Sequence, residues 1–173
     1  MEPLVTLPTP LPREAMDHQA LASRIPALTP AARLIWTAVV DIEARESLGM
    51  SAYGERFIVP ILGGHFWGGP GHEALCGLVR PGGADRQLLR RDGVKELHAV
   101  YEMQTQDGAV LGIDNQALID DAAQPTRYAV SRIRVAAPEG PHAWLNRRLI
   151  VGTVQALKPE RDAVLIRAYL MTT

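Results

Sequence analysis

A glycine-rich stretch at positions 63–85, GGHFWGGPGHEALCGLVRPGGAD, carries side chains that can do acid–base chemistry. His65 can transfer a proton near neutral pH, and Asp85 can do so once it is removed from water. Trp67 can pack against a ring of a bound molecule. Because glycine permits turns and bulges, we interpret the stretch both as corners between strands and as the lip of a binding site.

A second group of candidates lies further along the chain. His98 is the other histidine that could move a proton, with Asp85 orienting or assisting it. The remaining side chains suit substrate contact, either through polar atoms or by packing on a ring. They are Tyr101, Asp107, Asn115, Trp144 and Asn146, in addition to Trp67. This set predicts proton transfer on a small, largely apolar or aromatic molecule.

Each candidate also has a purely structural interpretation. Asp107 precedes Gly108 and could cap a hairpin turn, and Asp85 could brace the corner after two glycines. Tyr101 could pack in the core, whereas His98 could lie on a solvated outer face. Trp144 and Asn146 could close the end of the domain. The sequence leaves these interpretations open beside the functional ones.

Other chemistries have weaker support in the sequence. His65, His72, Glu73 and His98 could converge on a metal ion, but no HxH or HExxH spacing exists. The segment GMSAY lacks the last glycine of a GxSxG motif, and GGPGHEALCG lacks the GK[ST] of a phosphate-binding loop. We therefore expect neither a metal ion nor a cofactor.

Short alternating segments must position these residues. RLIWTAVVDIEA, ERFIVPIL, KELHAVYEMQT, GAVLGIDNQAL, RRLIVGTV and AVLIRAYLM each show strand-like patterns, and glycine pairs or Asp-Gly turns separate several of them. The pattern predicts an all-β protein with an antiparallel closed barrel or a sandwich. A short N-terminal helix is expected over 13–25, after a proline-rich extended arm. We expect an arm and helix over 1–30 and a barrel domain over 31–173.

Strand parity predicts which side chains share a face, because residues two apart on a strand point the same way. Leu97, Ala99, Tyr101 and Met103 share one parity. In a ligand-binding barrel the apolar face usually points inward. We therefore expect these four side chains to line the interior.

Composition limits the classes of partner. The chain has 173 residues, a net charge of −1 and no basic stripe, so nucleic-acid binding is not expected. The longest apolar run is far shorter than a membrane span, and the N-terminus does not resemble a secretory signal. The single cysteine, Cys76, rules out an internal disulfide and suits a reducing compartment. We expect a cytoplasmic protein with a small-molecule ligand, and the 1–30 arm leaves a homodimer open.

Four runs, taken in order, resemble the domain-of-unknown-function 3237 family: GERFIVPILGGHFWGGPG, GLVRPGGAD, LLRRDGVKELHAVYEMQTQDGAVL and AWLNRRLIVG. The resemblance covers about residues 34–171 and implies a lipocalin-like, calycin-type barrel whose function is mostly unassigned. Two arginines that are usual in this family are missing here. Val100 stands in the place of one, and Val130 lies near the place of the other. Since arginine anchors carboxylates and phosphates, the departures indicate a less acidic ligand or a different chemistry.

Three hypotheses about function follow from these patterns. The first is a cofactor-independent enzyme of the lyase, isomerase, hydratase or cyclase type. The second is a non-catalytic carrier or sensor of a small molecule in the same barrel. The third is an interaction protein that uses residues 1–30. The first two differ in whether a proton-transferring histidine and a carboxylate meet in one pocket.

Overall fold

The computed structural model describes residues 13–173, and the proline-rich arm expected before them lies outside the described residues. Helix α1 spans Arg13–Ala22, within the range predicted from the sequence. It is shorter than expected because the next residues form a turn, in which the amide of Ile25 donates to the carbonyl of Ala22. Residues 31–172 form one compact unit, and the described residues before them lie outside it.

The second unit is an all-β structure. Its elements are β1 (Ala31–Ile42), β2 (Glu46–Met50), β3 (Gly54–Gly68), β4 (Gly77–Val79), β5 (Ala84–Arg90), β6 (Lys95–Thr105), β7 (Val110–Asp120), β8 (Tyr128–Ala136), the 3-10 helix η1 (Ala143–Arg147), β9 (Ile150–Ala156) and β10 (Ala163–Thr172).

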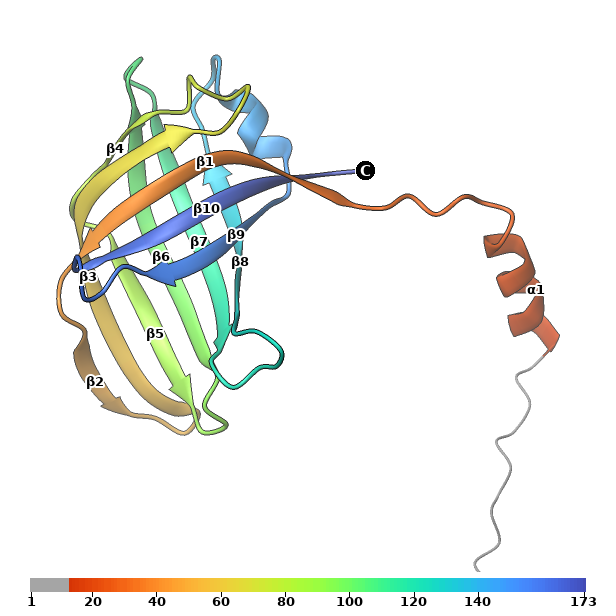
Figure 1. Ribbon diagram of the computed structural model, residues 1–173, viewed down its shortest axis with the longest axis horizontal. Coiled ribbons are helices and arrows are strands. Elements are labelled where there is room, and N and C mark those ends of the chain that lie inside the picture. Colours follow the sequence, from red (N-terminus) through yellow and green to blue (C-terminus); the bar gives the residue numbers. More distant parts are fainter. Residues whose placement is uncertain (1–12) are drawn as a thin grey trace, which may run out of the picture. The chain divides into compact units, whose positions relative to one another are not determined.

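The strands close into an antiparallel barrel, which confirms the predicted fold class (Figure 1). The sheet runs in the order β1-β10-β9-β8-β7-β6-β4-β3-β2, and β1 also pairs with β3, which closes the barrel. β4 and β5 occupy the same place between β3 and β6, one after the other along these two strands. Helix η1 and the β6–β7 hairpin lie at one end of the barrel, and the β5–β6 turn and the β7–β8 loop at the other (Figure 1).

Glycines permit the bends that closure requires. Gly63 and Gly64 have φ values of +137° and +143°, and the β1–β3 register shifts beside them. A Cβ atom on Gly64 would lie 2.1 Å from the carbonyl oxygen of Val39, so β1 can approach β3 only because this side chain is missing. The predicted Asp-Gly hairpins are confirmed, with Gly93 and Gly108 at positive φ in the β5–β6 and β6–β7 turns.

Several strands were not predicted. They are β2, β4, β5 and β8, at 46–50, 77–79, 84–90 and 128–136. β4 is too short to show a pattern. In β5 the side chains of Asp85 and Gln87 face the barrel interior, where a strand normally has apolar residues. The alternation of apolar and polar residues that would predict this strand is therefore missing.

The barrel interior contains two separate apolar clusters. The main cluster includes Trp36, Met103 and Leu111, and Leu145 of η1 adds to it. A smaller cluster consists of Ala117, Ile119 and Val154, with Leu97, Ala129 and Val164 packed against it. Members of both clusters border one cavity, which also has polar side chains in its lining.

Candidate functional site

A cavity of about 80 Å³ lies inside the barrel, where the two apolar clusters meet. Its lining is mostly aliphatic, but four of the side chains are polar: Asp85, Gln87, Tyr101 and Asn115. The predicted inward parity is confirmed, since Leu97, Ala99 and Tyr101 line this cavity and Met103 lies fully buried beyond them. The structure thus brings together Asp85, Tyr101 and Asn115 from the residues that the sequence had singled out.

The strand register explains how these side chains meet. Ala99 on β6 pairs with Asp85 on β5 and with Asn115 on β7, so the three residues form one row on the inner face. The outer two backbones are two strand spacings apart, or roughly 9 to 10 Å. Because Ala99 carries only a methyl group, the space between the two polar side chains stays open. Tyr101, two residues further along β6, points to the same face.

Asp85 is removed from water without gaining a cationic partner. Its Oδ2 atom accepts a hydrogen bond of 2.7 Å from Nε2 of Gln87, and its Oδ1 atom is buried without a partner. Burial raises the pKa of Asp85, and the hydrogen bond from Gln87, together with the backbone amide and the charge of His98, offsets this only in part. A carboxyl group with a raised pKa can take up or release a proton closer to neutral pH.

Tyr101 is fully buried and its phenol stays protonated. Burial raises the pKa of Tyr101, and the nearby charge of Asp85 raises it further. Gly83 allows this placement, because a Cβ atom at that position would lie 2.5 Å from Cβ of Tyr101. The site therefore holds a neutral O–H donor next to a carboxyl group.

Further buried polar atoms on the interior lack partners. These are Oδ1 of Asn115, Oγ of Ser131 and Nε1 of Trp36. Asn115 lines the cavity, and Ser131 pairs with the lining residue Ala117. A buried polar atom without a hydrogen bond costs about 1 to 3 kcal/mol, so the unpartnered oxygen atoms of Asp85 and Asn115 favour a cavity that a ligand or water completes.

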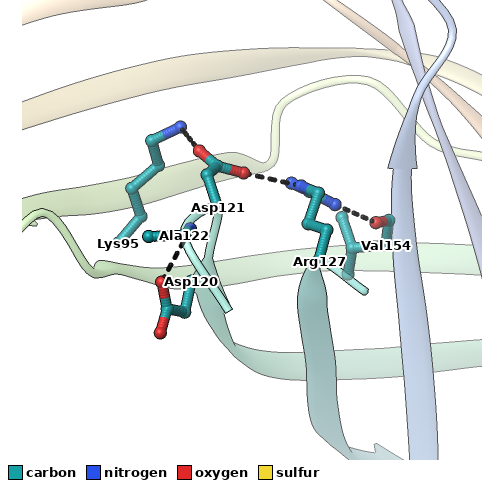
Figure 2. Close-up of polar contacts among 6 residues, drawn as sticks. All are labelled: Lys95, Asp120, Asp121, Ala122, Arg127 and Val154. Carbon is teal, nitrogen blue, oxygen red and sulfur yellow. Dashed lines mark hydrogen bonds and ion pairs between the residues drawn. The ribbon is translucent and has the colours of Figure 1, made fainter. Parts of the chain in front are cut away.

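An ion-pair network holds the loop at the end of the barrel nearer the smaller cluster (Figure 2). Asp121 lies between Nζ of Lys95 and Nε of Arg127, at 2.6 Å from each. Arg127 also donates to the carbonyl oxygen of Val154, a residue that lines the cavity. The network thus ties the β7–β8 loop to β6 and β9 beside the interior site.

The two predicted histidines do not reach this cavity. His65 and Trp67 are exposed on β3, on either side of the buried Phe66, so both point outward. His98 is also exposed, and its Nε2 atom lies 3.0 Å from Oδ1 of Asp114 on the outer face. The glycine stretch therefore forms corners of the barrel, and its histidine and tryptophan lie away from Asp85.

His98 instead borders a hollow of about 760 Å³, whose lining combines outward-facing side chains with Gln87, Leu97 and Ala117, which also line the interior cavity. The side chains around it include Arg86, Glu96 and Gln116, which alternate along their strands with the inward-facing residues. Most of its rim is exposed and carries charges of both signs. The smaller interior cavity differs from this wide hollow because buried polar atoms in its lining, Oδ1 of Asp85 and Oδ1 of Asn115, lack partners.

The remaining predicted residues brace the end of the barrel near η1. Asp107 accepts hydrogen bonds from the hydroxyl of Thr105 and from Nε2 of the buried His142, the latter at 2.9 Å. The ring of Trp144 stacks on that of His72 with 5.5 Å between centroids. The side chain of Asn146 exchanges two hydrogen bonds with the backbone of Ala137. None of the predicted three lines the interior cavity.

Two further observations concern metals and membranes. Within residues 13–173, no three His, Cys, Asp or Glu side chains come close enough together to hold a metal ion. No helix in the same part of the chain has the length and apolar character needed to cross a membrane.

Sequence reasoning missed Gln87 and the role of Ala99 as a spacer. Gln87 shares the parity of Asp85, so the assignment of a strand over 84–90 would have found it. The spacing role of Ala99 depends on the register of β5, β6 and β7, which the sequence does not reveal.

The chain is similar in sequence to proteins of one family. The family described as "Protein of unknown function (DUF3237)" matches residues 26–171. The UPF0311 protein RPA1785 of Rhodopseudomonas palustris is 31% identical over 134 residues, which cover 70% of this chain and 85% of the relative.

Solved structures show the same similarity. The crystal structure of RPA1785 aligns with a TM-score of 0.75 and 29% identity, covering 84% of this chain and all of that one. A structure described as an enzyme from Penicillium herquei aligns with a TM-score of 0.67 and 20% identity, covering 86% of this chain and 98% of the other. At that identity the second similarity concerns the fold alone.

Proposed function

The chain belongs to the DUF3237 family of proteins of unknown function, and from that premise we propose that it is a cofactor-independent enzyme that transfers protons on a small molecule inside the barrel. The observation that carries the proposal is the buried carboxyl group of Asp85, which faces the cavity with one oxygen unpartnered. The reaction type is that of a lyase, isomerase, hydratase or cyclase.

Asp85 takes the role of the proton carrier in this proposal. A general base must lie within hydrogen-bond reach of the proton that it removes, and Asp85 borders the space in which a substrate would lie. Its raised pKa makes the carboxylate a stronger base and lets the protonated form return the proton. His65 and His98 drop out of this role because both point away from the cavity.

Tyr101 and Asn115 would hold the polar atoms of the substrate. The phenol of Tyr101 is neutral, so its O–H can stabilise negative charge on a substrate oxygen as the proton leaves carbon. The amide of Asn115 approaches from the opposite side of Ala99 and fixes the orientation. Gln87 holds the carboxyl group of Asp85 in place through its hydrogen bond.

Elimination of water from a β-hydroxyketone is a suitable test reaction. With 3-hydroxycyclohexanone, a base removes the proton beside the carbonyl, the C–O bond to the hydroxyl breaks, and cyclohexenone and water form. We expect the protein to accelerate this reaction, or exchange of that proton with D2O, and Asp85→Asn to reduce the rate by about 100-fold or more. Proton NMR follows both processes.

A control and a contrary result complete the test. Asp114→Asn changes an outer-face carboxylate and should leave the rate unchanged. If the wild-type protein gives no more exchange or elimination than Asp85→Asn, the proton-transfer proposal fails.

A second candidate function is non-catalytic binding of a small molecule. It is favoured by one observation, namely that no histidine stands among the described residues that line the cavity. The same NMR experiment separates the two candidates, because a carrier binds its ligand without exchange of carbon-bound protons.

A further inference from the structure

We infer that the interior cavity selects a neutral ligand that presents hydroxyl or N–H donors to Asp85 and Asn115, bridging them across Ala99. The inference rests on the proposed site and adds the chemical class of the substrate.

The charges of the lining exclude an anion. Among the described residues that border the cavity there is no lysine, arginine or histidine, and the single ionisable carboxyl group is that of Asp85. A carboxylate or phosphate group placed here would lose its hydration and meet a like charge or a carboxylic acid without any compensating cation.

The surroundings also disfavour a cation. Apart from the four polar residues, the cavity is bordered by alanine, valine, leucine and isoleucine side chains. Taking an ammonium group out of water costs several kcal/mol, and one carboxyl group that already accepts a bond from Gln87 offsets little of it. A neutral molecule enters such a lining at a lower cost.

The unpartnered atoms determine the hydrogen-bonding character of the ligand. Oδ1 of Asp85 and Oδ1 of Asn115 are buried acceptors, and Asn115 as a whole is 4% exposed. A ligand with two donors would satisfy both atoms at once, whereas a ligand with only ether or ketone oxygens would leave them unsatisfied. The cost of an unsatisfied buried group makes this difference large enough to decide selectivity.

The volume limits how much of the ligand the cavity holds. At about 80 Å³ it is smaller than the roughly 150 Å³ that accommodates benzene in an engineered apolar core. A six-membered ring is larger than this space, so its binding requires a lining side chain to move, and Leu97 is half-buried at the cavity beside the smaller cluster. The donor-bearing edge of the ring lies over Ala99.

Four benzene derivatives test the inference by calorimetry and saturation-transfer NMR. Resorcinol offers two hydroxyl donors, 1,3-dimethoxybenzene offers only acceptors, benzylamine is a cation and benzoate is an anion. We expect resorcinol to bind at least about 10-fold more tightly than 1,3-dimethoxybenzene, which corresponds to the loss of about 1.4 kcal/mol. Binding of benzylamine and benzoate should be weaker than that of resorcinol.

Variants of neighbouring residues on β6 locate the binding. Ala99→Leu fills the space between Asp85 and Asn115 with an apolar side chain and should weaken resorcinol binding by about 10-fold or more. Val100→Leu is the matched control, because Val100 is half exposed on the opposite face of the same strand. It should leave the affinity unchanged.

Several results would overturn the inference. They are equal affinity for resorcinol and 1,3-dimethoxybenzene, tighter binding of either charged compound, binding of none of the four, or unchanged resorcinol binding in a folded Ala99→Leu protein. The outcome is independent of catalysis, since selective binding of donors without proton exchange would sustain this inference and refute the proposed enzymatic activity.

Discussion

Asp85 and Asn115 face one cavity from β5 and β7, two strands that are not neighbours, and one oxygen atom of each side chain is buried without a hydrogen-bond partner. Ala99 lies between them on β6 and pairs with both. Proteins rarely leave buried acceptors unsatisfied unless water or a ligand completes them. This relationship places the proposed chemistry inside the barrel.

The pH dependence of stability should report on Asp85. Its pKa is raised in the folded protein, so the folded state holds this proton more tightly than the unfolded state. The free energy of unfolding therefore falls as pH rises from about 4 through the raised folded pKa, by about 1.4 kcal/mol per unit of displacement. Asp85→Asn removes this loss and should raise the melting temperature more at pH 8 than at pH 5. An equal change at both values would show that Asp85 titrates normally.

Tyr101→Phe should lower turnover without a large change in stability. Removal of the hydroxyl keeps the ring that packs against Gly83, so we expect the free energy of unfolding to change by less than about 1.5 kcal/mol. Turnover of 3-hydroxycyclohexanone should fall by about 10-fold or more, because the donor to the substrate oxygen is lost. Chemical denaturation and the NMR assay give the two numbers. Unchanged turnover would remove Tyr101 from the site.

His65→Ala and His98→Ala should change stability, ligand affinity and turnover very little. Both side chains lie on the outer face, where substitutions usually change stability by about 0.5 kcal/mol or less. Resorcinol affinity and turnover should match those of the parent protein. A 100-fold loss of turnover in either variant would restore the histidine mechanism that the sequence suggested.

Gly64→Ala should damage the fold. The new Cβ atom would lie 2.1 Å from the carbonyl oxygen of Val39 at a φ of +143°, and the backbone strain alone costs about 1 to 3 kcal/mol. Gly112→Ala is the matched control, because its Cβ atom would meet the nearest atom, Cβ of Ala136, at an ordinary 3.5 Å. Thermal melts of the two variants should differ by many degrees, and similar melts would contradict the close approach of β1 and β3.

Asp121 should control the loop beside the cavity (Figure 2). The hydrogen bonds from Lys95 and Arg127 lower the pKa of Asp121, so its contribution is present above pH 4 and is lost as pH falls through the lowered value. Asp121→Asn should cost about 0.5 kcal/mol or less, since the group is exposed, but should speed hydrogen exchange over residues 121–127.

A carboxylate in another turn provides the control for that measurement. Asp92 is also exposed and pairs with Arg90 in the β5–β6 turn. Asp92→Asn should leave exchange over 121–127 unchanged. Equal exchange in the parent and Asp121→Asn proteins would show that the ion pairs do not hold the loop.

The sequence by itself determined the all-β fold class and which side chains of β6 share a face. Alternation of Leu97, Ala99, Tyr101 and Met103 depends only on the two-residue repeat of a strand, which is a local property of the chain. The Asp-Gly turns likewise follow from local backbone preferences. Asp85, Tyr101 and Asn115 could be selected from the sequence because their side chains can carry a proton or hold polar substrate atoms.

Only the tertiary structure decided which candidates meet. The histidines and tryptophans were chosen for their chemistry, but β3 turns His65 and Trp67 outward, and η1 and the hairpin at Asp107 lie at the end of the barrel away from the β7–β8 loop. The spacer role of Ala99 needs three strands in register, from parts of the chain far apart in sequence. Register and closure are set by long-range pairing and by glycine bulges, so the site emerges only when the whole barrel has formed.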